Sequence, residues 1–464
     1  MKEKSPPRRP AAGHRPDAST AGPGSSQEAL HLTNLGVELF NKGQHQKAFD
    51  AFQKAYQMAP EVSTLSSNLG AALISLKKLE EALTVLRRAH EQSGTDAALL
   101  VNLGVTYGEK GEKDREIIQY QAAINEDPKL KEAYLNLGVA YMDQGQAEKG
   151  AQAKANASVA RAIELYPKSS EAHLAMGLVL ELQKDFPQAL VALDRALELS
   201  SRSQAVMLHR ADVLAVLGRR QEAIKAYQDL LNHNRELPQA HISLSEVLLA
   251  EGRADEARES AVRAVEMELS DLFLLRKLGK LLIDLNLGHR ALEVFDRVLT
   301  RDPKDHETAH AMGQIYSRQR EYDKAVDCFE KAFRIDPRYS KASYNLAMIH
   351  YTRGHYDLAR KVLDLTLKAD AKHLKAWNLL AKTWLKQGQP KLALEAWEQA
   401  LAIRPNSSSL LKSLIKVSAE LDDKPRMTKY YTQAKALKAE REKERTAGDT
   451  TFADEDDEID QSTT

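Results

Sequence analysis

The stretch Leu374–Ser407, LKAWNLLAKTWLKQGQPKLALEAWEQALAIRPNS, decides the fold of this 464-residue chain. Its apolar residues recur at helical spacing, first around Trp377 and then around Trp397, which predicts two amphipathic helices. Gly388 can take a positive φ where the chain reverses, and Pro405 ends the second helix. Because two such helices cannot bury their apolar faces alone, this unit needs neighbours.

Related units precede this one at a step of 34 residues. If Leu374 is position 1, position 8 is Gly, Ala or Ser in the first eleven units, positions 20 and 27 are mostly Ala, and position 15 is often Gly. Position 24 holds large side chains, among them Phe52, Tyr120 and Trp397. Small residues allow two helices to approach closely, and large ones fill the space between them. The pattern therefore predicts a stack of helix pairs.

This period and its helix–turn–helix pattern resemble the tetratricopeptide repeat (TPR) family. The resemblance implies an all-α fold, a right-handed α-solenoid of about twelve repeats over residues 29–441. A basic disordered arm (1–28) is expected before it and a charged, acidic disordered tail (442–464) after it. The predicted repeats are 29–62, 63–96, 97–130, 131–169 with an insertion, 170–203, 204–237, 238–271, 272–305, 306–339, 340–373, 374–407 and 408–441, the last a degenerate cap.

Three features depart from the regular pattern. Glu116 stands at position 20 of the third repeat in place of a small residue, and we expect either looser packing or a carboxylate that reaches solvent. The fourth repeat is five residues too long, with the surplus at about 148–158, which predicts a longer turn or a longer second helix. The acidic run 454–460 either solubilises the chain, docks on a basic partner, or folds against the basic arm.

Composition limits the class of protein. The 66 basic and 66 acidic residues give a formal net charge of zero, which disfavours a partner made of nucleic acid. No apolar run is long enough to span a bilayer, and the N-terminus has no secretory apolar region, so we expect no membrane insertion. The single cysteine, Cys328, suits a reducing cytoplasmic location. We expect it to be a packed or partly exposed thiol and not a nucleophile.

The TPR resemblance places positions 2, 5, 6, 9, 12 and 13 on a concave groove. Position 6 carries an amide in each of the first four repeats, and position 9 beside it is apolar. This pattern is similar to the asparagine ladder in the repeat domain of O-linked N-acetylglucosamine transferase. Amides at equal steps offer a donor and an acceptor to an extended peptide backbone, although they are also common family residues that meet water. The candidate partner-binding residues are Asn34, Asn68, Asn102, Asn136, Val37, Val105 and Val139.

The groove changes chemistry in the later repeats. Arg276, Lys277 and Lys280 form a cationic cluster, which is either a site for a carboxylate or phosphate or, as we favour, a solvated face. Tyr344 and Asn345 continue the predicted partner-binding surface. Position 9 carries no Asn in any repeat, unlike the carboxylate clamp of chaperone-binding family members, so a role as a heat-shock chaperone co-factor is disfavoured.

One motif resembles that of an enzyme. His306, Glu307 and His310 match the H-E-x-x-H motif of zinc peptidases, in which two imidazoles share a zinc ion and the glutamate acts as base. The repeat pattern already explains Gly313 and Tyr316, and Tyr316 stands where metzincins have a third histidine. We therefore interpret the motif as a chance match, and predict no catalytic residue, no metal site and no cofactor.

The sequence thus predicts a non-enzymatic scaffold or adaptor that holds protein or peptide segments in its concave groove. The alternative is a targeting or regulatory subunit of a separate enzyme, as the glycosyltransferase-like array suggests. The chain ends 23 residues after Arg441, which we expect to be too few for a catalytic domain. Neither the identity of the partner nor the oligomeric state follows from the sequence.

Overall fold

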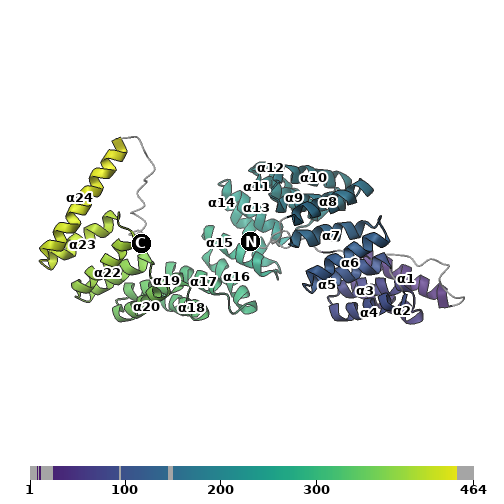
Figure 1. Ribbon diagram of the computed structural model, residues 1–464, viewed down its shortest axis with the longest axis horizontal. Coiled ribbons are helices and arrows are strands. Elements are labelled where there is room, and N and C mark those ends of the chain that lie inside the picture. The colour runs from purple at the N-terminus through teal and green to yellow at the C-terminus, as the bar shows by residue number, and fades with distance from the viewer. Residues whose placement is uncertain (1–7, 9, 12–24, 94–95, 145–149, 447–464) are drawn as a thin grey trace. The chain divides into compact units, whose positions relative to one another are not determined.

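The computed structural model describes residues 8, 10–11, 25–93, 96–144 and 150–446 of the chain. Over these residues the chain forms 24 helices and no strand, stacked as successive pairs (Figure 1). This arrangement confirms the predicted all-α solenoid of helix–turn–helix repeats. The chain divides into two units, 1–251 and 252–464, and each is described by itself.

The first unit begins with a helix that starts four residues before the predicted first repeat. Its helices are α1 (Ser25–Asn41), α2 (His45–Met58), α3 (Ser63–Ser75), α4 (Leu79–Ser93), α5 (Ala97–Glu109), α6 (Lys113–Glu126), α7 (Lys131–Gln144), α8 (Ala151–Leu165), α9 (Ser170–Leu182), α10 (Phe186–Leu199), α11 (Gln204–Val216), α12 (Arg220–His233) and α13 (Pro238–Ala250). Helices of one repeat pack together, and α3, α5, α7 and α9 also contact one another in turn. The first helices of the repeats therefore form one continuous layer.

The second unit repeats the same arrangement. Its helices are α14 (Ala254–Glu266), α15 (Leu272–Asp284), α16 (Gly288–Arg301), α17 (His306–Arg318), α18 (Tyr322–Ile335), α19 (Ser340–Thr352), α20 (Tyr356–Ala369), α21 (Leu374–Lys386), α22 (Pro390–Ile403), α23 (Ser408–Glu420) and α24 (Lys424–Thr446). Contacts run from α15 to α16, from α17 to α18 and so on to α23 and α24, and each pair packs on the next.

The predicted contact between small and large residues holds each pair together. A Cβ atom added to Gly104 would lie 2.5 Å from Tyr120 Cε1, and one added to Gly313 would lie 2.6 Å from Phe329 Cε1. Tyr120 and Phe329 are among the largest fully buried side chains. Glycine at position 8 therefore creates the space that the position 24 side chain fills, because a methyl group there would overlap the ring.

The turn between the helices of a pair has the predicted left-handed residue. Gly388 has a φ of 69°, as expected of a glycine that ends a helix. Lys184 and Arg320 occupy the same position of their repeats and have a φ of 62° each. The geometry of the turn is therefore a property of the repeat, and it persists where no glycine is present.

Both ends of the solenoid differ from the sequence boundaries. The expected disordered arm (1–28) was wrong at its end, because α1 already begins at Ser25. The expected tail was wrong at its start, because α24 runs to Thr446. In the fourth repeat, α7 and α8 have 14 and 15 residues, against 13 and 14 in α5 and α6, and the rest of the surplus falls in their connection. Residues 145–149 and the acidic run 454–460 lie outside the described residues.

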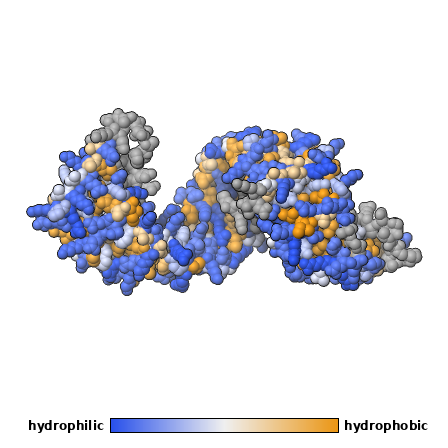
Figure 2. Space-filling view, viewed as in Figure 1, coloured by the Kyte–Doolittle hydropathy of each residue, from blue (hydrophilic) through white to orange (hydrophobic). Residues whose placement is uncertain are grey.

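Charged and polar residues cover most of the surface seen in Figure 2, with apolar residues between them. Among the described helices, none combines the length and apolar character that crossing a membrane requires.

Candidate peptide-binding groove

Asn102 of α5 holds the main chain of a residue from the N-terminal arm. Its Nδ2 donates to the carbonyl oxygen of Ala11 over 3.0 Å, and its Oδ1 accepts from the Ala11 N–H over 2.8 Å. Both bonds are buried and join residues 91 positions apart in the sequence. One amide side chain thus satisfies both backbone groups of a single peptide residue, which is the interaction predicted for an asparagine ladder.

Three residues before Ala11, the guanidinium of Arg8 reaches two carboxylates of the groove. Its Nε donates to Glu116 Oε1, while its Nη2 donates to Glu116 Oε2 over 2.9 Å and to Asp143 Oδ2 over 2.6 Å. Glu116 belongs to α6 and Asp143 to α7. The side chain of Glu116 is 0% exposed, and that of Arg8 only 13%. This is a buried, two-point contact between a guanidinium and a carboxylate, with a second carboxylate at its edge.

Both expectations for Glu116 were therefore wrong, since its side chain neither loosens the pair nor reaches solvent. The reason lies opposite it, at Gly108 of α5. The repeats on either side carry Phe40, Ile74 and Met142 at the corresponding position 12. A Cβ atom on Gly108 would lie 2.6 Å from Glu116 Cδ and would also meet Arg8 Nε. The missing side chain provides the space for the guanidinium.

We define the pocket as Gly108, Glu116 and Asp143. The charges and burial of its carboxylates favour a bound cation. Burial raises the pKa of Glu116, while the hydrogen bond and charge of Arg8 act against that rise. Burial alone would lower the pKa of Arg8, but its hydrogen bond with Glu116 and the charges of both carboxylates raise it above its ordinary value. A buried carboxylate without a partner is costly. The pocket therefore needs a positive group beside Glu116.

The predicted ladder residues of the first unit, including Asn102, differ in what they contact and in how far they are buried. Asn102 Nδ2 also donates to Ser67 O over 2.9 Å and to Ser67 Oγ over 3.0 Å, which ties the second and third repeats together. Asn34 is half-buried on α1, and its Oδ1 is enclosed without a hydrogen-bond partner among the described residues. The remaining candidates are enclosed to similar degrees: Asn68, Asn136, Val105 and Val139 are buried, and Val37 is half-buried.

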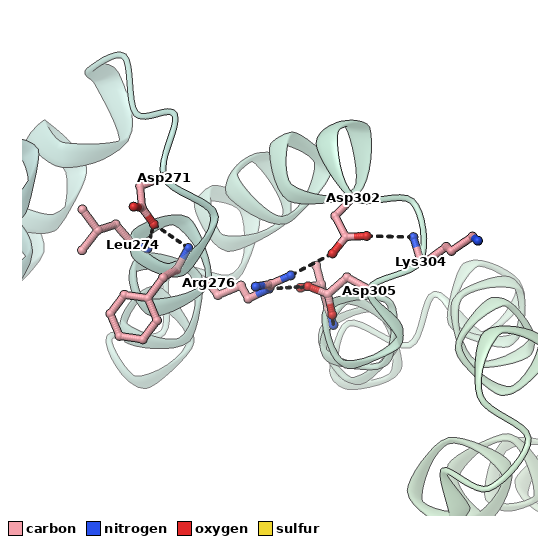
Figure 3. A network of polar contacts seen from close by, with 8 residues as sticks. Asp271, Leu274, Arg276, Asp302, Lys304 and Asp305 are labelled. Carbon is pink, nitrogen blue, oxygen red and sulfur yellow. Dashed lines mark hydrogen bonds and ion pairs between the residues drawn. The ribbon is translucent and has the colours of Figure 1, made fainter. Parts of the chain in front are cut away.

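The cationic cluster of the second unit is arranged differently. Arg276 of α15 donates from Nε to Asp305 Oδ2 over 2.5 Å and from Nη2 to Asp302 Oδ2 over 3.0 Å, as Figure 3 shows. The Asp305 side chain also accepts from the N–H of Thr308, and it thereby caps the N-terminus of α17. Burial acts to raise the pKa of Asp305, but its hydrogen bonds with Thr308 and Arg276 hold that pKa below its usual value. Arg276 is thus committed to the connection between repeats.

Lys277 and Lys280, the other two members of the cluster, also lie on α15. Lys280 is exposed, and Lys277 is half-buried. Tyr344, also half-buried, stacks on His373 with ring centroids 5.3 Å apart. Arg276 and Tyr344 are thus each held by neighbouring residues of the array, whereas Asn102 and Glu116 contact the arm.

The H-E-x-x-H motif is part of the packing between repeats. Asn345 Nδ2 donates to His310 Nε2 over 2.9 Å, so the nitrogen that a metal would need is already an acceptor. Burial, with the charges of Lys341 and His306, lowers the pKa of His310 to about 4. Within the part of the chain that the structure describes, no three His, Cys, Asp or Glu side chains are grouped to hold a metal ion.

Cys328 of α18 is half-buried. Burial, followed by the charge of Asp327, raises the pKa of its thiol to about 11. A thiol in this environment is not activated as a nucleophile.

Matches to known families agree with this architecture. The chain matches the family described as cytochrome c-type biogenesis protein H TPR domain over residues 284–411. It also matches the psidin N-terminal TPR repeats region over 37–173 and the tetratricopeptide repeat family over 153–204 and 208–270. All are families of tetratricopeptide repeats, and the chain belongs among the tetratricopeptide repeat proteins. No curated protein matches it.

Several solved structures resemble parts of this chain. A tetratricopeptide repeat protein of Parabacteroides merdae ATCC 43184 is 19% identical, covering 55% of this chain and 99% of its own, with a TM-score of 0.43. The human IFIT1 dimer with m7Gppp-AAAA is 16% identical, with 82% and 90% coverage and a TM-score of 0.45. A thermophilic TPR protein of Thermus thermophilus is 24% identical, with 40% and 100% coverage and a TM-score of 0.37. At such scores we infer nothing about function from these proteins.

Proposed function

We propose that this protein is a non-enzymatic scaffold or adaptor whose first unit captures an extended segment of a partner protein. The observation that carries this proposal is the pair of hydrogen bonds between Asn102 and the main chain of Ala11. These bonds use backbone groups that every residue except proline has, so the same amide is suited to a segment of another chain. The family matches support this class of function, because tetratricopeptide repeats generally bind proteins or peptides.

The neighbouring repeats support binding over several residues of such a segment. Asn34, Asn68 and Asn136 occupy the position of Asn102 in their own repeats. The enclosed Oδ1 of Asn34 is an acceptor suited to a main-chain N–H. Val105 and Val139 add apolar contacts beside the amides. Each contact is modest, and affinity would grow with the number of repeats engaged.

The class and location of the partner belong to the same proposal. The zero net charge supports a protein partner over a nucleic acid, whose phosphates require a basic surface. The lone Cys328, whose thiol has a raised pKa, suits a reducing cytoplasmic location.

Affinity capture tests this function. Full-length protein and its Asn68→Ala/Asn102→Ala variant would be immobilised, exposed to native lysate, and compared by quantitative mass spectrometry. We expect the partners of the wild-type chain to be depleted from the variant. Equal capture by both chains would remove the asparagines from the proposed function.

The control must account for stability, because Asn102 also bonds to Ser67. We expect the double variant to melt at a lower temperature than the wild type, since truncation leaves buried groups of Ser67 and Ala11 without a partner, at about 1–3 kcal/mol. Thr383→Val in the second unit removes a buried hydroxyl that donates to Leu379 O. This control should also lower the Tm while leaving capture unchanged.

A further inference from the structure

We propose that the groove of the first unit selects extended segments with an arginine three residues before a small residue, and that the chain's own arm is a tethered competitor for this site. Arg8 and Ala11 then occupy the places that a partner's residues would take. This inference rests on the proposed function, to which it adds the chemistry of the ligand and a means of regulation.

The selectivity for arginine follows from the shape of the pocket. Glu116 receives two different nitrogens of one guanidinium on its two oxygens, and Asp143 receives a bond from the second of these nitrogens. Lysine has a single ammonium and cannot reproduce the forked contact. The space left by Gly108 suits a flat group, since even a Cβ atom there would overlap Glu116 and Arg8.

The requirement for a small residue follows from the enclosure of Ala11. Ala11 as a whole is 3% exposed, and its N–H and carbonyl groups both face the fully buried Asn102. A larger side chain would have to displace groove residues that are already packed. Pro10, which precedes it, has no N–H to satisfy and favours extended backbone. The arm thus presents Arg-x-Pro-Ala, in which the first and last residues carry the recognition.

Several observations distinguish this pocket from an ordinary structural ion pair. Arg8 and Glu116 are 108 residues apart, and Arg8 lies outside every repeat. Two departures from the repeat pattern, Gly108 and Glu116, meet at the guanidinium. A third group, Asp143 of the next repeat, also turns to it. The repeats therefore form a pocket for a guanidinium that comes from outside them.

Tethering makes the arm a competitor. Only 13 residues of sequence separate Ala11 from Ser25, where α1 begins. A short tether gives an effective concentration on the order of millimolar. A partner segment must therefore bind well enough to displace the arm, and loss of Arg8 should open the site to weaker ligands.

The test uses the full-length chain and a fluorescein-labelled peptide with the sequence of residues 5–13, SPPRRPAAG. Fluorescence anisotropy would give its Kd for the wild type and for Arg8→Ala and Arg9→Ala chains. We expect Arg8→Ala to bind the peptide at least ~10-fold more tightly than wild type, because its own arm no longer competes. Arg9→Ala removes the same charge and should bind the peptide as the wild type does. Equal tightening by both substitutions would indicate a general charge effect and overturn the proposal.

Selectivity is measured in the Arg8→Ala chain. Replacing the first arginine of the peptide by lysine or alanine, or Glu116 by Gln in the protein, should weaken binding by at least ~30-fold, as expected when one partner of a buried charge pair is lost. Asp143→Asn should weaken binding less than Glu116→Gln does. Because this variant keeps Glu116, it still tests the pocket if Glu116→Gln does not fold. Asp114→Asn removes an exposed charge of the same helix and should leave the Kd unchanged. Unaltered binding of the lysine and alanine peptides would overturn the arginine requirement.

Two further measurements separate the possible failures. If Asn102→Ala leaves peptide binding to the Arg8→Ala chain unchanged, the proposed capture of main chain is itself wrong. If binding needs Asn102 but not the peptide's arginine, only the present inference fails. Light scattering should give the same mass for the wild type and Arg8→Ala. A wild-type dimer that becomes a monomer in Arg8→Ala would show that the arm acts between copies, which overturns the tethered competitor.

Discussion

The charged side chains of the two units pair with residues of different origin. In the first, Glu116 pairs with Arg8, which lies 108 residues away and outside the array. In the second, Arg276 pairs with Asp302 and Asp305, which are 26 and 29 residues away. The second separation is less than one repeat, so that pair connects consecutive elements of the array. The first pair instead connects the array to a segment outside the repeats, which is the place that our proposal gives to a partner segment.

The contact between His310 and Asn345 is a second example of a polar pair that joins neighbouring repeats. These residues are 35 positions apart, close to one period, and they join the first helices of consecutive repeats, α17 and α19. A polar pair between residues of neighbouring repeats belongs to the architecture, whereas Arg8 lies outside every repeat, so its pairing with Glu116 points to a binding site.

The largest expected difference between the units is in the coupling of the charge pairs. A double-mutant cycle of Arg8→Ala and Glu116→Ala should give a coupling of about 2 kcal/mol or more in the free energy of unfolding, because the pair is buried. Urea denaturation followed by circular dichroism would measure it. The exposed pair of Arg115 on the same helix and Glu112, which directly precedes that helix, serves as the control, with an expected coupling below about 0.5 kcal/mol. Similar values for both pairs would contradict a specific pocket.

Acid should weaken the contacts between repeats of the second unit through His310. Its folded pKa of about 4 lies below the ordinary 6.5, so its neutral form contributes stability that is complete above pH 6.5 and is lost as the pH falls through about 4. This contribution is on the order of 2–3 kcal/mol. We expect the free energy of unfolding of the wild type to fall more steeply between pH 7 and pH 4 than that of His310→Asn. Parallel curves would contradict the buried, neutral imidazole.

A smaller effect is expected for Arg276. Its side chain is 35% exposed, so solvent partly screens its ion pairs with Asp302, which is 36% exposed, and with Asp305, which is 7% exposed. Arg276→Ala should lower the free energy of unfolding by about 1 kcal/mol. The same substitution in the Arg8→Ala chain should leave the affinity for the arm peptide unchanged. Reduced peptide binding, measured by anisotropy, would mean that the two units do not differ in the way described.

The smallest effect concerns the turn that both units share. Lys184 and Arg320 have a positive φ, which costs residues other than glycine some free energy. Lys184→Gly and Arg320→Gly should each stabilise the chain by about 0.5–1 kcal/mol, as thermal denaturation would show. Alanine at either site should give no such gain. A gain in one unit alone would mean that the two turns are not equivalent.

The fold was predictable because it is set by a local pattern repeated many times. The 34-residue period fixed the helix pairs, and the contact of Gly104 with Tyr120 follows directly from positions 8 and 24. The ends of the array were less predictable, since α1 and α24 extend past the repeat boundaries. No core position marks where a terminal helix stops.

The candidate site was only partly predictable. The sequence predicted Asn102 as a peptide-binding residue, but its bonds to Ser67, which give it a structural role, depend on the spacing of the helices. Glu116 was recognised as a departure, yet its partner lies 108 residues away in a Pro-rich segment without periodicity. The signal that could have revealed the pocket was the pairing of two departures in one repeat, Gly108 lacking a side chain while Glu116 gains a charge.

The most direct measurement is amide hydrogen exchange at Ala11 in the full-length chain, read by NMR after 15N-alanine labelling. If the groove holds the arm, the Ala11 N–H, which donates to buried Asn102 Oδ1, should exchange far more slowly than the same amide in the free peptide of residues 5–13. Glu116→Gln should abolish this protection, whereas Asp114→Asn should preserve it. Exchange at the free-peptide rate in the wild type would contradict the account.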